Sequence, residues 1–172
     1  FLGRRADAAT GAAIWYFDPF GSDQPALLLY GTNPEPGRMF HVKEASGDGR
    51  RHQFHLTGLS PGTRYYYRIA GHDDAIRSFR TAPSGAQPVR FLCMGDTGNT
   101  RRGGYGHSYY RDILRAASSW YGDRGPDFTL HAGDLVRTGA DLDGWHQFLS
   151  STELISGRPL LVAPGNHEFL KD

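Results

Sequence analysis

Short runs of apolar and aromatic residues, separated by residues typical of turns, fill the first half of the chain. Alternation of this kind predicts β-strands, and Gly, Pro, Asn, Asp and Ser mark the turns between them. The predicted strands cover residues 12–17, 26–31, 38–44, 50–56, 63–69 and 75–81. Their length and spacing predict a small all-β sandwich over residues 1–81.

A different pattern begins at residue 89. Apolar runs alternate with longer stretches of helical period, and such an order predicts parallel strands joined by right-handed crossovers. The runs cover 89–94, 127–132 and 159–163, and the helical stretches cover 108–121 and 142–155. Residues 82–88, APSGAQP, are small and polar with two prolines, so they are expected to link the sandwich to an α/β domain at 89–172.

The apolar residues of the first helical stretch recur at helical spacing. Tyr109, Ile113, Leu114, Ala117 and Trp120 are therefore predicted to form its buried face.

Composition narrows the classes of function. The 172 residues are 38% hydrophobic and 22% charged, which is typical of a soluble globular protein. The net charge of +1 and the lack of long Lys and Arg clusters argue against nucleic acid as a partner. No apolar run approaches the ~20 residues of a membrane span. The single cysteine, Cys93, lies in an apolar run and is expected to be buried.

Each apolar run of the second half ends in glycine followed by a side chain with an oxygen donor. The three pairs are Gly95-Asp96, Gly133-Asp134 and Gly165-Asn166. In a parallel sheet the carboxyl ends of the strands share one edge, where such folds bind ligands. One Gly-Asp pair is weak evidence, because both residues are common in turns, but the threefold recurrence predicts a metal site.

The donor types indicate the chemistry. Carboxylate and carboxamide oxygens suit Mg, Mn or Fe and, with imidazoles added, Zn. Because a carboxylate has two oxygens, it can bridge a metal pair that activates water and neutralises phosphoryl charge. His167 follows Asn166 directly, so contact with substrate or protonation of the leaving group is its expected role.

Two resemblances follow from these motifs. LSPGTRYYYRI at 59–69 resembles a fibronectin type III module, in which Tyr65 would form a tyrosine corner. Gly95-Asp96-Thr97-Gly98, Gly133-Asp134 and Gly165-Asn166-His167-Glu168 resemble the calcineurin-like metallophosphoesterases, most closely their purple acid phosphatase branch. The resemblance covers nearly the whole chain and corresponds to the first half of the family's α/β sandwich.

The resemblance implies a role for each matching residue. Asp96 would ligate the first metal, Asp134 would bridge two metals, Asn166 would ligate the second, and His167 would act near the leaving group. The implied cofactors are two divalent or trivalent ions among Fe, Zn and Mn, and the implied substrate is a phosphate ester. An extracellular or periplasmic location is also implied.

The sequence departs from the family at two points. Arg137 stands where the purple enzymes carry a tyrosine that binds ferric iron, so a colourless site is expected; Arg137 could instead face phosphate or lie on the surface. Three further histidine ligands that the family supplies from later segments have no counterpart here. His107 could line the cleft, and His131 is expected in the core.

Two functions therefore remain open. The chain is either the amino-terminal part of a phosphomonoesterase-like hydrolase, completed by a missing carboxy-terminal part or another chain, or an inactive binding module made of a sandwich and half a phosphatase fold. Its start at Phe1 without a leader fits a processed form or a fragment.

Overall fold

The chain divides into two compact units, Phe1–Pro88 and Val89–Asp172, which are described separately. The computed structural model describes residues 2–3, 9–18, 21, 25–39, 41–44, 46–47, 51–71, 73–98, 106–121, 125–155 and 157–170. Within these residues, every helix is too short or too polar to cross a membrane.

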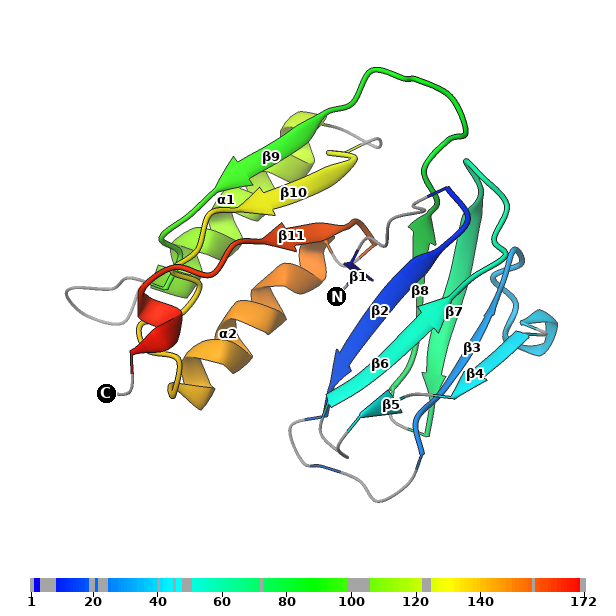
Figure 1. Ribbon diagram of the computed structural model, residues 1–172, viewed down its shortest axis with the longest axis horizontal. Coiled ribbons are helices and arrows are strands. Elements are labelled where there is room, and N and C mark those ends of the chain that lie inside the picture. Colours follow the sequence, from blue (N-terminus) through cyan, green and yellow to red (C-terminus); the bar gives the residue numbers. More distant parts are fainter. Residues whose placement is uncertain are drawn as a thin grey trace. The chain divides into compact units, whose positions relative to one another are not determined.

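The first unit consists of two antiparallel sheets of four strands each (Figure 1). One sheet has the order β1-β2-β6-β5, with β1 at Leu2–Gly3, β2 at Ala12–Phe17, β6 at Arg51–Leu56 and β5 at Ser46–Gly47. The other has the order β4-β3-β7-β8, with β4 at His41–Glu44, β3 at Leu27–Gly31, β7 at Arg64–Ala70 and β8 at Asp73–Arg80. The predicted sandwich is therefore confirmed, and the short strands β1 and β5 are additions to the six expected.

Alternating side chains build the core of the sandwich. Along β6 and β7 every second residue is buried, as expected for strands with one face toward an apolar interior. The core consists of Ala12, Ile14, Ala26, Leu28, Phe54, Leu56, Leu59, Tyr65, Tyr67, Ile69 and Phe79.

Tyr65 forms the predicted tyrosine corner. Its ring is buried against Phe79, with the ring centroids 5.6 Å apart. Its hydroxyl oxygen accepts a hydrogen bond from the backbone N–H of Ser60 at 2.9 Å. The bond fixes the bend that leads into β7.

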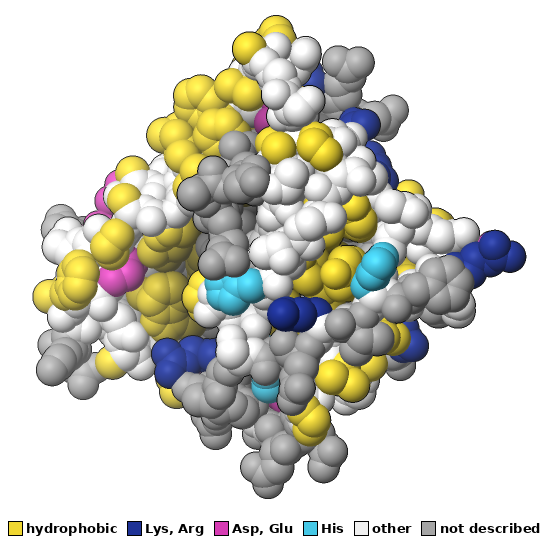
Figure 2. Space-filling view, turned by 45° about the vertical axis from the view of Figure 1, so that its right-hand side comes forward, with side chains coloured by type: hydrophobic (Ala, Val, Ile, Leu, Met, Phe, Trp, Pro, Cys, Tyr) yellow, Lys and Arg dark blue, Asp and Glu magenta, His cyan; other side chains and the backbone are white. Residues whose placement is uncertain are grey.

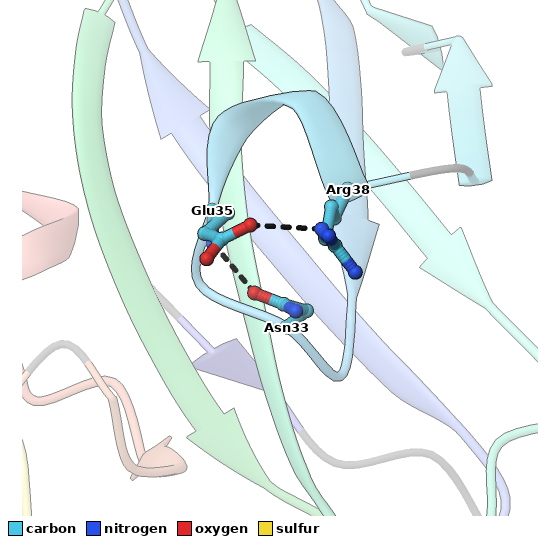
Figure 3. A network of polar contacts seen from close by, with 3 residues as sticks. All are labelled: Asn33, Glu35 and Arg38. Carbon is cyan, nitrogen blue, oxygen red and sulfur yellow. Dashed lines mark hydrogen bonds and ion pairs between the residues drawn. The ribbon is translucent and has the colours of Figure 1, made fainter.

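A short 3₁₀ turn, η1 at Pro36–Arg38, precedes β4 (Figure 3). The side-chain oxygen of Asn33 accepts from the backbone N–H of Glu35 at 2.9 Å, and the Glu35 carboxylate pairs with Arg38 at 2.8 Å. Both charged side chains are about two-thirds exposed. Because exposed pairs contribute little, this network shapes the turn rather than stabilising the unit.

The second unit is a three-stranded parallel sheet with the order β11-β10-β9. Its strands are β9 at Phe91–Met94, β10 at Phe128–His131 and β11 at Leu160–Val162. The helix α1 at Gly106–Tyr121 lies between β9 and β10 in the chain, and α2 at Leu142–Thr152 lies between β10 and β11, continued by the 3₁₀ turn η3 at Glu153–Ile155. A last 3₁₀ turn, η4, covers His167–Phe169. The predicted α/β class is confirmed.

Both helices cover the same face of this sheet. Tyr110 of α1 and Phe148 of α2 each place a ring edge-on against His131 of β10, at 6.1 and 5.7 Å between centroids. The two rings also stack on each other at 5.3 Å. Asp141 caps the start of α2 by accepting from the N–H of Gly144.

The predicted buried face of α1 is largely wrong. Three of the five side chains expected to be buried, Tyr109, Ile113 and Trp120, are exposed. More generally, Figure 2 shows hydrophobic side chains on the surface of the molecule. The residues that pack inward are Tyr110 and Leu114. The reason is that α1 offers two apolar faces, and the position of the sheet and α2 decides which of them is buried.

The second face of the sheet carries apolar side chains without a covering helix in the described residues. Phe91 and Phe128 stack on it at 5.3 Å, and Cys93 stands opposite Leu130 in the register. Phe91 and Cys93 are both exposed. The expectation of a buried Cys93 is therefore wrong, because both helices pack on the other face.

Tyr65→Phe tests the corner. The substitution keeps the ring in the core and removes the acceptor of the Ser60 N–H, so the free energy of unfolding should fall by about 1 kcal/mol. Urea unfolding followed by circular dichroism measures the change. Tyr66→Phe makes the same change at a half-buried position on the other side of β7 and is the control. Equal effects of both substitutions would contradict the corner bond.

Candidate functional site

Three loops meet at the carboxyl ends of the parallel strands. The backbone N–H of Asp96, after β9, donates to the carbonyl of Gly133, after β10, at 3.0 Å. The N–H of Gly98 donates to the carbonyl of Asp134 at 2.9 Å. From the loop after β11, the N–H of His167 donates to Oδ1 of Asp134 at 3.1 Å. The loop after β10 is thus bonded to both of its neighbours.

The approach of these loops is too close for side chains at two of the motif glycines. A Cβ on Gly98 would lie 2.3 Å from the backbone of Val136, and a Cβ on Gly165 would lie 2.2 Å from Oδ1 of Asp134. Neither neighbour is free to move, because the first is backbone and the second is held by hydrogen bonds. The glycines of the motifs are therefore needed for direct contact between loops.

Asp96 and Asp134 both adopt left-handed backbone conformations, with φ of 58° and 54°. This region is unfavourable for residues other than glycine, and Asn and Asp tolerate it best. Local strain of this kind persists only where surrounding contacts fix the backbone. Here the contacts between the loops supply that constraint at both aspartates.

His131 connects the loops from below. Its Nδ1 lies 3.2 Å from the backbone N–H of Gly133, which can only donate, so Nδ1 accepts and the ring proton resides on Nε2. Nε2 then donates to the Thr97 hydroxyl at 2.9 Å. Burial lowers the pKa of His131, although Glu168, Asp96 and Asp134 act in the opposite direction. Both ring nitrogens are engaged within the protein, and His131 is a core residue, as expected.

Glu168 joins the loops after β10 and β11. Its carboxylate accepts from the backbone N–H groups of Asp134 and Gly165, at 2.9 and 2.6 Å, and from those of Leu135 and Val136, at 2.7 and 3.2 Å. Glu168 was not among the site residues predicted from the sequence. An acid placed directly after a turn rich in backbone N–H groups was the available signal.

His167 is oriented by the loop that contains Arg137. Its Nδ1 lies 2.5 Å from the backbone carbonyl of Arg137, which can only accept, so Nδ1 carries the proton. The bond therefore engages Nδ1 rather than Nε2 and orients the ring. Nearby, the Trp145 indole donates to the carbonyl of Gly139 at 3.0 Å, and the N–H of Gly139 donates to the carbonyl of Leu170 at 3.1 Å. Helix α2 therefore supports the same loop.

The predicted oxygen donors lie at the outer side of these contacts. Asp96 and Asn166 are exposed and Asp134 is half-buried. Asn166 begins η4, yet its side chain makes no capping hydrogen bond, so its amide oxygen is not used by the turn. Carboxylate and amide oxygens suit hard cations, but within the described part of the chain no group of three or more His, Cys, Asp and Glu side chains could hold a metal.

The structure gives less support for the other two predicted site residues, Arg137 and His107. Arg137 is exposed and contacts His167 through its backbone, so binding of phosphate by its guanidinium stays a prediction. His107 lies in the first turn of α1, and its side chain is outside the described residues.

The state of His131 makes stability depend on pH. Its pKa in the folded protein is below the ordinary 6.5, so the unfolded chain binds the proton more readily and stability falls as the pH drops below about 6.5. His131→Asn preserves an acceptor near Gly133 and cannot titrate, so its stability should change less between pH 7.5 and 5. Chemical unfolding of both proteins at the two pH values measures the difference, and parallel losses would argue against a neutral buried His131.

Two family models match the chain in sequence. "Purple acid Phosphatase, N-terminal domain" matches residues 8–81, within the first unit. "Calcineurin-like phosphoesterase" matches residues 89–172, the second unit. The two matches leave only the linker and the first seven residues uncovered.

Curated relatives extend the comparison. Purple acid phosphatase 21 of Arabidopsis thaliana is 35% identical over 156 residues, which cover 84% of this chain and 32% of that protein. The uncharacterised protein Rv2577 of Mycobacterium tuberculosis is 32% identical over 151 residues, covering 76% of this chain and 27% of that protein. The chain thus spans about a third of the length of these relatives.

Solved structures share the fold. Purple acid phosphatase PPD1 from yellow lupin (Lupinus luteus) superposes with a TM-score of 0.72 at 20% identity, covering 97% of this chain and 34% of that one. PhoD superposes with a TM-score of 0.62 at 17% identity, covering 96% of this chain and 38% of that one. The two matching domains, the relatives and the shared fold agree: the chain belongs to the calcineurin-like phosphoesterases and carries the amino-terminal domain of the purple acid phosphatases.

Proposed function

We propose that this protein is a metal-dependent phosphoric ester hydrolase of the phosphomonoesterase type, with a dinuclear site built on the loops after β9, β10 and β11. The contact of these loops around Asp134 carries the proposal, since the N–H groups of Gly98 and His167 bond to that one residue from opposite sides. Membership in a family of phosphoesterases supports it.

The carboxylate and amide side chains at this edge of the sheet fit this activity. Asp96 would hold one cation, Asp134 would bridge both, and Asn166 would hold the second. The chemistry that bound Fe, Zn or Mn supplies at such a site is activation of water and neutralisation of phosphoryl charge. Arg137 cannot donate to a metal, so a colourless site is proposed.

His167 is proposed as the residue that acts on the substrate. Its Nδ1–H bond to the carbonyl of Arg137 holds the ring in one orientation and leaves Nε2 as the exchangeable position. A histidine held in this way can transfer a proton to the leaving oxygen of a phosphate ester. No protein nucleophile is required in this scheme.

We also propose that further chain, from this protein or another, completes the site. Three oxygen-donor side chains cannot fill the coordination of two cations. Among the described residues no helix covers the sheet face that bears Phe91, Phe128 and Cys93, which supports the same view, because parallel sheets are normally covered on both faces. An extracellular or periplasmic location is proposed from the resemblance to purple acid phosphatases.

The alternative is an inactive binding module. Metal analysis and hydrolysis of a generic aryl phosphate, on the longest obtainable form of the protein, separate the two functions. Intact mass adds a simple check, because a species well above 19.0 kDa favours the hydrolase. A protein that binds no metal and turns over no phosphate ester would favour the binding module.

Asp134→Asn tests the bridging role. Asparagine tolerates the left-handed backbone and keeps an oxygen for the His167 N–H, so the loop should persist while the bridging charge is lost. Metal affinity should fall by more than about 100-fold, because replacing a residue that only hydrogen-bonds to a metal ligand already lowers affinity by up to that factor. Activity should disappear. Isothermal titration measures the affinity. Asp143→Asn, on the exposed side of α2, is the control, and normal turnover by Asp134→Asn would refute the assignment.

His167→Asn tests the catalytic role separately. The asparagine amide can still donate to the carbonyl of Arg137, so the turn should be kept while Nε2 is removed. The metal content should stay unchanged, and kcat for an aryl phosphate should fall by about 10²- to 10⁴-fold. His146→Asn at an exposed position of α2 serves as control. Unaltered kinetics of His167→Asn would rule out this role.

A further inference from the structure

The carboxylate of Glu168 is saturated by backbone donors. Oε1 accepts from Leu135 and Val136, and Oε2 accepts from Asp134 and Gly165. An ionised carboxylate offers about four lone-pair positions, so these four N–H groups use its accepting capacity. Glu168 is therefore not available as a metal ligand, although it lies two residues from Asn166.

These bonds are of the stronger kind. Hydrogen bonds to an ionised acceptor are roughly twice as strong as those between neutral groups. Glu168 is half-buried, so water competes less for its oxygens than at an exposed carboxylate. A cluster of converging backbone N–H groups is also a favourable environment for negative charge.

The hydrogen bonds of Glu168 restrain the backbone next to the predicted ligands Asp134 and Asn166. The N–H of Asp134 belongs to a residue at a φ of 54°, a left-handed conformation that is unfavourable and relaxes unless surrounding contacts hold it. On the other loop, Glu168 bonds to Gly165 three residues earlier. Asn166 and His167 lie between these two ends, so the bond closes the turn that presents them.

We propose that Glu168 is a positioning residue, which sets the Asp134 carboxylate, the Asn166 amide and the His167 ring relative to one another through the backbone. It touches neither cation nor substrate. Its effect on metal binding rests on the function proposed above, whereas its effect on the two loops does not. Loss of Glu168 should therefore loosen the loops first and weaken metal binding as a consequence.

Glu168→Gln tests both parts. The amide keeps the size of the side chain but turns one acceptor into a donor, which then faces two backbone N–H groups. Hydrogen exchange of the N–H groups of Asp134, Leu135, Val136 and Gly165 should accelerate at least about tenfold, while that of Ala132, which bonds to Met94, stays unchanged. Affinity for Co²⁺, titrated by its visible absorption well below the unfolding temperature, should fall about 10- to 100-fold.

Glu153→Gln in η3 is the matched control, since it makes the same chemical change at an exposed carboxylate of the same unit. If Glu168→Gln does not fold, Glu168→Asp replaces it: the charge is kept, but the shorter side chain cannot reach both loops, and intermediate losses are expected.

The outcomes separate the two proposals. Unchanged exchange at the four N–H groups overturns the positioning role, and so does faster exchange with unchanged Co²⁺ affinity. A wild-type protein that binds no Co²⁺ in its longest obtainable form, the form used for every Co²⁺ titration, overturns the proposed function and the metal part of this inference, while the exchange rates still decide whether Glu168 holds the loops.

Discussion

Direct backbone contact between the three strand-end loops is the constraint on which the rest of the candidate site depends. The loop after β10 is central, because it receives hydrogen bonds from the loop after β9 through Gly98 and from the loop after β11 through His167. Such contact is possible only where no Cβ intervenes, as at Gly98 and Gly165. The glycines of the motifs and the oxygen donors beside them thus serve one purpose: the first bring the loops together and the second occupy the edge so formed.

The same contacts account for the strained backbone. Asp96 and Asp134 adopt left-handed backbone conformations, which are energetically unfavourable and which an isolated turn would avoid. Bonds from neighbouring loops, from the Thr97–His131 pair below and from Glu168 at the side, hold these conformations. An arrangement held in advance does not have to be organised when a ligand binds, which is the general advantage of a preorganised site. The strain is therefore part of the site rather than a defect of the fold.

The sequence predicted the strands and their order better than it predicted their surroundings. Apolar runs that end in Gly-Asp or Gly-Asn can be recognised in the amino-acid sequence. The parallel topology then brings the ends of these strands to one edge of the sheet. The buried face of α1 was not predictable in the same way, because Tyr109 and Tyr110 are adjacent and equally apolar, and only Phe148 and the sheet select Tyr110. Cys93 shows the same limit: an apolar run indicates a strand in a core but not which face the helices cover.

The motif side chains fall into two groups. Some make hydrogen bonds within the protein, and others are exposed to solvent. Thr97, His131 and Glu168 use their polar side-chain atoms in hydrogen bonds within the protein. His131 and Glu168 each bond to residues of two different loops or turns. Asp96 and Asn166 are exposed, and the Asn166 side chain makes no capping hydrogen bond to the turn that follows it. Because burial without a partner is costly for polar groups, the hydrogen bonds of the first group stabilise the fold as well as connecting the loops. The second group faces solvent, where its oxygen atoms are accessible to a ligand, as the proposed function requires.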